Sequence, residues 1–459
     1  MPKLSPCARQ AQKRTSFCTS PVICCVRKGG KPMQEQKKIQ DALDYIEENI
    51  ASPITAQELC DSCHYSLYHF YRLFESATGM PVMQYILRRR LLWAAWEMAQ
   101  GKSVLDAALR YGFDTASGFY KAFRRELGMP PSRFAAAFRL RKPFPIKLAQ
   151  EAHVMIPIQK LRSILRHWRM EALPLSPVVF QPSGYISDNA WWVGNDYVLK
   201  CSLNPAALQL NARIAKRLQE NGFRGALHVE TCDHAPYVSD GEMVFALTKR
   251  VNGQRRKVQT PQDAFTLGKA LGKLHGILRR EDSVLCREQD VFREVMDTWL
   301  APAAQALKLP EDFVQRYRNA AERLRPLLPV QIIHRDPNPD NMLWQDDEII
   351  GFIDFDLSQK SARLFDVCYA ATAILSETVD RPEESLHLWP QLLLAIAKGY
   401  DSVSPLSAAE KEALPYMVLT VQFICVGYFA TVDKYRELYD KNMRMTRFIL
   451  EHLDELKLS

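Results

Sequence analysis

Apolar and aromatic residues recur at helical spacing through residues 40–140, and one block of this pattern occurs twice. The block FYRLFESATGMPVMQY at 70–85 returns as FYKAFRRELGMPPSRF at 119–134, in a register 49 residues later. Six positions are identical, namely Phe70/Phe119, Tyr71/Tyr120, Phe74/Phe123, Gly79/Gly128, Met80/Met129 and Pro81/Pro130. Self-similarity at a fixed spacing indicates one structural unit used twice.

Each copy has the pattern of two helices joined by a short turn. The residue types of a capped helix start occur at 55–58 and at 103–106. Gly79 and Gly128 fit left-handed helix ends, and a proline two residues later prevents continuation. The predicted turns lie at 61–66 and 111–115, and a long amphipathic helix over 83–100 should separate the copies. A second helix presented in this way can lie in the major groove of DNA.

Residues 33–140 resemble the DNA-binding domain of the AraC/XylS family of transcription regulators. The resemblance is carried by Arg90-Leu91 and Ala94, by YGF at 111–113 and by GMPPSRF at 128–134. It implies two recognition helices in successive major grooves, with sequence-specific DNA as the partner. By position, the base-reading candidates are Tyr68, Tyr71, Arg72, Ser117, Gly118 and Lys121. The expected phosphate contacts are Arg124, Arg125 and Arg133, which position the protein without reading sequence.

The charge distribution supports nucleic-acid binding only locally. Residues 1–140 hold 20 Lys and Arg against 12 Asp and Glu, whereas residues 141–459 hold 40 of each. Residues 1–32 contain seven of those basic residues and no acidic one, so residues 33–140 alone sit near +1. The stretch 121–142, with seven basic residues and one Glu, is the better indication. A duplicated helical module could also bind protein, and the four repeat phenylalanines are expected in its core.

Composition sets the remaining limits. A chain of 459 residues is typical of about three domains. We expect a disordered basic leader at 1–32, with the start at Met33 left open, and a linker at 141–160 that contains Pro143 and Pro145. The eleven cysteines do not form a pair of CxxC motifs, as a zinc site would need, which favours reduced thiols in the cytoplasm. No apolar run reaches the roughly 18–20 residues of a membrane span, so no membrane partner is expected.

The second half has the pattern of an α+β fold in two lobes, 161–252 and 253–459. Helices are predicted at 161–171 and 205–221, strands between them and up to about 251, and long helices after Pro261. Within this half, IHRDPNPDNMLW at 333–344 spaces His334, Asp336 and Asn341 as HxDxxxxN, and IIGFIDFD at 349–356 follows a tight turn.

This constellation has the parts that phosphoryl transfer requires. Asp336 could accept the proton of an attacking hydroxyl, and Asn341 with Asp354 offers hard oxygen ligands for Mg²⁺. His334 is expected to orient the loop, and Asp356 to support the site or touch substrate. The competing interpretation is a surface loop rich in Asp, Asn and Pro, which the apolar hairpin ending in IDFD disfavours.

The second half resembles the aminoglycoside phosphotransferase (APH) family, which includes choline kinase-like proteins. The resemblance is carried by the two motifs above, YVLK at 197–200, GYISDN at 184–189, TKRVNG at 248–253 and Arg363-x-x-Asp366. It implies a protein-kinase-like fold that uses ATP and Mg²⁺. The residues implied are Lys200 at the phosphates, Gly184 and Ser187 in the covering turn, Thr248 and Arg250 at the hinge, and His334 and Asp336 in catalysis.

Two departures from the family pattern leave the activity open. Gln209 and Asn211 stand where the family has a Glu that pairs with the lysine, and the covering turn has a single glycine. We therefore carry two functions. One is a DNA-binding regulator fused to a phosphotransferase that phosphorylates a hydroxyl of a small metabolite or antibiotic. The other is a regulator whose kinase-like half only senses a ligand. The substrate, the DNA target and the oligomeric state stay open.

Overall fold

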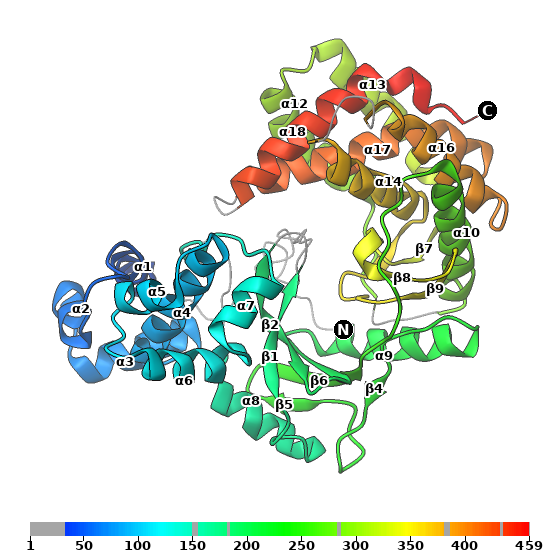
Figure 1. Ribbon diagram of the computed structural model, residues 1–459. Helices are drawn as coiled ribbons and strands as arrows, with labels where there is room; N and C mark the ends of the chain where they lie inside the picture. The colour runs from blue at the N-terminus through cyan, green and yellow to red at the C-terminus, as the bar shows by residue number, and fades with distance from the viewer. Residues whose placement is uncertain are drawn as a thin grey trace, which may run out of the picture. The chain divides into compact units, whose positions relative to one another are not determined.

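The computed structural model describes residues 33–148, 155–180, 184–281, 286–380, 386–431 and 435–458. The expected basic leader at 1–32 lies outside these ranges, as does part of the expected linker. The described chain forms two compact units (Figure 1). The first unit contains the described residues of 33–205 together with 228–250, and the second contains 206–227 with those of 251–458. The first unit thus joins the helical module to the strands that follow it, and the predicted domain boundaries stay predictions.

The helical module of the first unit consists of two helix-turn-helix copies. Its helices are α1 Met33–Glu48, α2 Ala56–Cys63, α3 Leu67–Thr78, α4 Val82–Ala99, α5 Val104–Arg110, α6 Ala116–Leu127 and α7 Pro131–Ala137. The predicted caps are confirmed. Thr55 and Glu58 form a reciprocal capping box at α2, and Ser103 accepts the N–H of Asp106 at α5. Gly79 and Gly128 end α3 and α6 with φ of 79° and 82°.

The prediction that the connecting helix α4 is amphipathic is wrong. Arg88, Arg89 and Glu97 are buried along with the apolar residues of this helix. The cause is tertiary, because residues 140–148 and strand β2 (Tyr185–Val193) cover the side of α4 that a free module would expose. The charged groups are paired there: Arg89 with Glu47, and Arg88 with Asp188 at 3.3 Å.

The first unit continues with an antiparallel sheet. Its strands are β1 Leu175–Phe180, β2, β3 Tyr197–Ser202, β4 His228–Val229, β5 Val238–Asp240 and β6 Met243–Lys249. The order is β1-β2-β3-β6-β4, with β5 also paired to β6. Before the sheet, α8 spans Ile158–Leu165 and continues as a short 3-10 helix to Trp168, so the expected helix at 161–171 begins and ends earlier than predicted. Arg169 ends it with φ of 56°.

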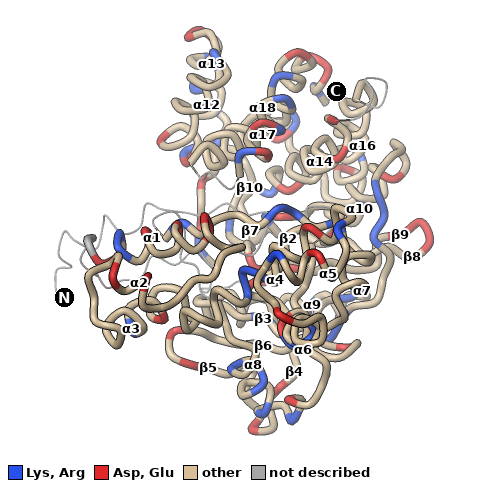
Figure 2. Tube along the Cα trace, turned by 60° about the vertical axis from the view of Figure 1, so that its left-hand side comes forward, with Lys and Arg blue, Asp and Glu red and all other residues tan. Residues whose placement is uncertain are grey.

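The second unit is mainly helical (Figure 1). Its α-helices are α9 Pro205–Glu220, α10 Pro261–Leu278, α11 Val291–Glu294, α12 Leu300–Leu307, α13 Glu311–Leu324, α14 Leu364–Thr378, α16 Trp389–Asp401, α17 Ala408–Phe429 and α18 Arg436–Glu451. Two short antiparallel pairs lie among them: β7 Val330–Ile333 with β10 Gln359–Ala362, and β8 Met342–Gln345 with β9 Glu348–Phe352. Basic and acidic residues interleave along α13 and α18 (Figure 2).

Helix α17 differs from the sequence expectation about membranes. Its 22 residues are long and apolar enough to cross a bilayer by length and composition alone. However, 83% of its most apolar window is buried inside the protein. Core helices of globular proteins pass the same test, so this helix is weak evidence for a membrane span. It supplies much of the core of the second unit, where it packs against α12, α13, α14 and α18.

Candidate active site and DNA-binding face

His334 lies fully buried at the end of β7 and orients the loop that follows. Its Nε2–H donates to the carbonyl oxygen of Ile353 at 3.0 Å, and its Nδ1 accepts the N–H of Asp336 at 3.4 Å. Burial lowers the pKa of His334, so the ring is held neutral in this arrangement. The imidazole therefore joins the start of the HxDxxxxN loop to the strand end that precedes Asp354.

Asp366 fixes the same loop through its main chain. The buried carboxylate accepts the N–H of His334 at 2.8 Å and that of Arg335 at 2.9 Å. It also lies 3.0 Å from Nε2 of His275 on α10. Arg335 has φ of 74°, a conformation that costs free energy for a residue with a side chain. The two accepted hydrogen bonds hold the backbone in that conformation.

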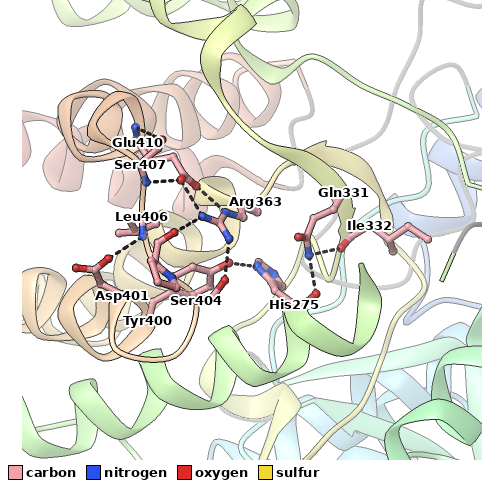
Figure 3. A network of polar contacts seen from close by, with 11 residues as sticks. His275, Gln331, Ile332, Arg363, Tyr400, Asp401, Ser404, Leu406, Ser407 and Glu410 are labelled. Carbon is pink, nitrogen blue, oxygen red and sulfur yellow. Dashed lines mark hydrogen bonds and ion pairs between the residues drawn. The ribbon is translucent and has the colours of Figure 1, made fainter. Parts of the chain in front are cut away.

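A buried polar network extends this support to three helices (Figure 3). Nδ1 of His275 lies 2.8 Å from the hydroxyl of Tyr400 on α16. The guanidinium of Arg363 donates to both carboxylate oxygens of Glu410, at 2.7 and 2.8 Å, and to Ser404 Oγ at 2.7 Å. Glu410 also completes a capping box at the start of α17. The loop is therefore anchored to α10, α16 and α17 through pairs that lie out of solvent.

Asp336 is the buried acid at the centre of the loop. Its carboxylate accepts from Asn338 Nδ2 at 2.9 Å and from Asn341 Nδ2 at 3.2 Å. Burial, with a smaller contribution from the nearby Asp354, raises the pKa of Asp336 to about 7, although hydrogen bonds from Asn338, Tyr369 and Asn341 act to lower it. A carboxyl that titrates near neutrality suits a general base.

Asn341 and Asp354 are brought together by the β8–β9 hairpin. Met342 pairs with Phe352, and the N–H of Ile353 donates to the carbonyl oxygen of Asn341 at 3.0 Å. Asp354 follows with φ of 68°. The predicted turn at 345–348 is confirmed by the pairing of Gln345 with Glu348. In the described part of the chain no three His, Cys, Asp or Glu side chains gather as a metal cluster.

Asn211, which stands where the APH family has a glutamate, makes a side-chain hydrogen bond within the second unit. The amide of Asn211 on α9 donates to the carboxylate of Asp356, and its Oδ1 is buried without a hydrogen-bond partner. Sequence reasoning identified Asn211 only as a missing glutamate. The contact spans 145 residues and carries no local signal.

Sequence reasoning also missed a charged group beside the base. Arg335 is buried over the ring of Phe365, 4.0 Å from its centroid, and 3.6 Å from the carboxylate of Glu294. Burial lowers the pKa of Arg335 to about 10. Glu294 also accepts from Trp299 Nε1 at 3.0 Å, at the end of a five-residue π-helical stretch, Val295–Trp299. Such stretches are frequent at functional sites, but the sequence gives no simple pattern for them.

The predicted nucleotide residues belong to the first unit. Lys200 lies on β3, in register with Ala190 and Ala246, and its charge acts with burial to lower the pKa of His228 to about 4. Gly184 begins the segment of β2 with φ of 71°. Their roles at a nucleotide stay predictions.

Three other predicted nucleotide residues have contacts inside the first unit. Ser187 is buried; its hydroxyl donates to Asn189 Oδ1 at 2.9 Å and accepts the N–H of Ala190. Thr248 is buried on β6, and Arg250 lies 4.7 Å over the ring of Trp192. The hydroxyl of Ser187 is thus engaged within β2, and a role of this residue at a nucleotide stays a prediction.

The predicted DNA-reading side chains lie on α3 and α6, the second helix of each copy. Tyr68 is 80% exposed, and the other exposed candidates are Arg72, Ser117, Gly118, Lys121, Arg124, Arg125 and Arg133. Tyr71 is half-buried. The four repeat phenylalanines are fully buried, as predicted. Arg125 also pairs with Glu126 at 3.0 Å on the same helix.

Comparison with known proteins supports the resemblance to a known family in each half of the chain. A family model described as a helix-turn-helix domain matches residues 59–137, and one described as the phosphotransferase enzyme family (APH) matches 179–406. The HTH-type transcriptional activator AarP of Providencia stuartii is 35% identical over 97 residues, which are 21% of this chain and 72% of AarP.

Solved kinase structures are similar over the second half. An amicoumacin kinase in complex with AMP-PNP, Ca²⁺ and Ami is 15% identical, with a TM-score of 0.47, over 65% of this chain and 93% of that one. A microcompartment-associated aminopropanol kinase is 16% identical, with a TM-score of 0.49, over 66% of this chain and 99% of that one. On the two family models and the similarity to AarP, the chain belongs to the AraC family of regulators through an all-α double helix-turn-helix module, fused to an α+β kinase-like domain of the APH family.

Proposed function

We propose that this regulator carries an active phosphotransferase, which moves the γ-phosphoryl group of ATP to a hydroxyl of a small molecule. The observation that supports this most is the environment of Asp336. A buried carboxyl with a pKa of about 7, bonded to an amide that can also bind metal, has the properties of a base. A protein that only binds a ligand has no chemical need for such a group.

The oxygen donors of the loop fit Mg²⁺. The Asn341 amide donates both hydrogen bonds to Asp336 through its nitrogen, which leaves its Oδ1 as the hard oxygen proposed to join Asp354 at the metal. When bound, Mg²⁺ would neutralise charge on the phosphates of ATP. Lys200 is the proposed contact of those phosphates. Gly184 and Ser187 are proposed for the covering turn, and Thr248 and Arg250 for the adenine side.

The proposed reaction is balanced by the groups named. The acceptor hydroxyl oxygen forms a bond to the γ-phosphorus as the bond from that phosphorus to the β,γ-bridging oxygen breaks. The hydroxyl proton passes to a carboxylate oxygen of Asp336, and ADP leaves with the bridging oxygen. Phosphoryl transfer depends mainly on positioning and charge stabilisation, so the fixed loop geometry set by His334 and Asp366 contributes directly.

The sensor remains the second candidate because of Asn211. Its side chain is engaged with Asp356, at a position where a glutamate partner for Lys200 is expected. A domain that binds Mg-ATP without aligning its γ-phosphoryl group for transfer would signal that ligand is bound, and it would turn ATP over only slowly.

The test is transfer from γ-labelled ATP to a panel of amino alcohols, sugars, hydroxylated metabolites and aminoglycosides. ADP formation without any acceptor, with water as the nucleophile, is followed beside it. The proposal predicts a labelled product for at least one class and slow ADP formation in its absence. Tight binding of Mg-ATP with neither product nor ADP would establish the sensor instead.

We also propose that α3 and α6 read DNA bases through Tyr68, Tyr71, Arg72, Ser117 and Lys121, with Arg125 at a phosphate. Support comes from the exposure of these side chains on the second helix of each copy, with Tyr71 half-buried, whereas the phenylalanines of the same helices are buried.

A further inference from the structure

The structure contains a buried junction between the DNA-binding module and the strand proposed to cover the nucleotide. Arg88 of α4 is 2% exposed, and its Nη2 lies 3.3 Å from Oδ1 of Asp188 on β2. The hydroxyl of Tyr185 donates to the other oxygen of Asp188 at 3.1 Å. Because α4 connects the two helix-turn-helix copies, its position sets how far apart α3 and α6 lie.

A second contact of the junction is made by the main chain. The N–H of Arg141 donates to the carbonyl oxygen of Gly184 at 3.0 Å. A Cβ at position 184 would lie 2.5 Å from the nitrogen of Arg141 and 2.6 Å from the oxygen of Arg139. Only glycine permits this approach, so the segment after α7 is seated directly on the start of β2.

The segment after α7 is itself held by the helical module. Arg89 of α4 donates to the carbonyl oxygen of Phe144 at 2.9 Å. The ring of Phe144 stacks with Tyr185, with centroids 6.2 Å apart at 14°. Val179 of β1 and Ile186 of β2 also pack against the core of the helical module. The β1–β2 strands therefore cannot shift without moving groups that are fixed to α4.

The junction is incompletely satisfied. Nε and Nη1 of Arg88 and the hydroxyl of Tyr85 are buried without hydrogen-bond partners. A small cavity of about 50 Å³ lies at the junction, lined in part by Arg89, Phe144, Tyr185 and Asp188. Buried polar groups left unpaired cost free energy, and this cost favours a second arrangement of the strands that would give Arg88 and Tyr85 partners. These are the features of an element that can adopt two states.

We propose that nucleotide binding under β2 and DNA binding by α3 and α6 are energetically coupled through this junction; the inference rests on the proposed function. A ligand that favours one arrangement of β2 changes the spacing of the recognition helices through Arg88 and Asp188. Coupling between two sites is reciprocal, so DNA must change the affinity for nucleotide by the same factor.

The test is a complete binding cycle on the full chain. The probes are a duplex selected in vitro for binding to this protein and a fluorescent, non-hydrolysable ATP analogue with Mg²⁺. The Kd for each is measured with and without a saturating amount of the other. We expect both ratios to differ from one by about fivefold or more, in the range typical of allosteric coupling, and to be equal.

Variants at the junction separate this coupling from simple loss of function. Arg88→Met keeps much of the side-chain volume without the charge, and Asp188→Asn keeps the shape of its partner. Each should bring the two ratios toward one. Arg166→Ala, at an exposed arginine after α8, is the matched control and should leave the ratios as in the wild type.

The outcomes distinguish the two levels of the proposal. If wild-type protein binds each ligand and both ratios equal one, the coupling is overturned while the proposed function stands. If the nucleotide or the duplex does not bind by itself, the proposed function fails, and the coupling with it. If Arg88→Met and Asp188→Asn fold but keep the wild-type ratio, the junction is not the route.

Discussion

The side-chain amide of Asn341 donates to Asp336 twice, at 3.0 Å to its main-chain oxygen and at 3.2 Å to its Oδ2. The same residue is thus bound to the proposed base, and its remaining side-chain oxygen is the proposed metal ligand. Since one side chain does both, a change at Asn341 should alter metal use and the position of the base together.

Asn341→Ala should therefore weaken the response to Mg²⁺. Loss of a metal-orienting group typically costs about 10- to 100-fold in metal affinity or activity, so the Mg²⁺ concentration for half-maximal ADP formation should rise about tenfold or more. Asn319→Ala, at an exposed asparagine of α13, is the matched control and should behave as the wild type. An unchanged Mg²⁺ dependence in Asn341→Ala would remove this residue from the metal site.

The pH dependence of the reaction should follow Asp336. Its pKa is raised to about 7 by burial, and a base must be deprotonated to accept a proton. The rate constant kcat/KM should rise with pH through that value and fall about tenfold per pH unit well below it. The hydrogen bond from Tyr369 lowers the pKa of Asp336, so Tyr369→Phe should move the rising limb to higher pH. A limb that moves to lower pH, or a flat profile, would contradict the assignment of Asp336.

Asp366→Ala should lower the stability of the second unit and also slow the reaction. It removes the acceptor of two buried N–H groups, of His334 and Arg335, and the partner of His275. Each of these three buried groups costs about 1–3 kcal/mol when left unsatisfied, so the free energy of unfolding should fall by about 3 kcal/mol or more. Urea denaturation followed by circular dichroism measures this loss. Asp312→Ala, at an exposed ion pair with Arg316, is the control; equal effects of the two changes would refute the anchoring role.

The sequence predicts those features whose causes are local. The capping box of Thr55 and Glu58, the left-handed glycines 79 and 128 and the turn between β8 and β9 each depend on a few consecutive residues. The spacing of His334, Asp336 and Asn341 likewise placed the three groups on one loop. The structure confirms the positions and conformations predicted for these residues, while their functional roles stay predictions.

The remainder depends on residues far apart in the chain. Arg88 is buried because Asp188, 100 residues later, covers it, and a helical period alone cannot show that. Asn211 contacts Asp356 across 145 residues. The two main-chain hydrogen bonds that Asp366 accepts from the loop also could not be predicted from the sequence. Their donors, the N–H groups of Arg335 and His334, lie 31 and 32 residues before Asp366.

On DNA, Arg72→Ala and Lys121→Ala should each weaken binding to the selected duplex by about tenfold or more, because base contacts carry discrimination. Arg125→Ala should instead weaken binding to all duplexes and reduce the salt dependence by about one ion equivalent. Fluorescence anisotropy over a range of salt concentrations measures both. Lys37→Ala, at an exposed lysine of α1, is the control. Binding by Lys121→Ala equal to that of the wild type would exclude it as a contact.

The central claim is that Asp336 is the base of a phosphoryl transfer, and Asp336→Asn tests it most directly. The measurement is the rate of ADP formation from Mg-ATP, with and without acceptor, beside the Kd for Mg-ATP. Loss of a general base typically costs about 10²- to 10⁴-fold in rate, and the account predicts a loss in that range with nucleotide affinity within about threefold of the wild type. Equal rates in Asp336→Asn and the wild type would contradict it.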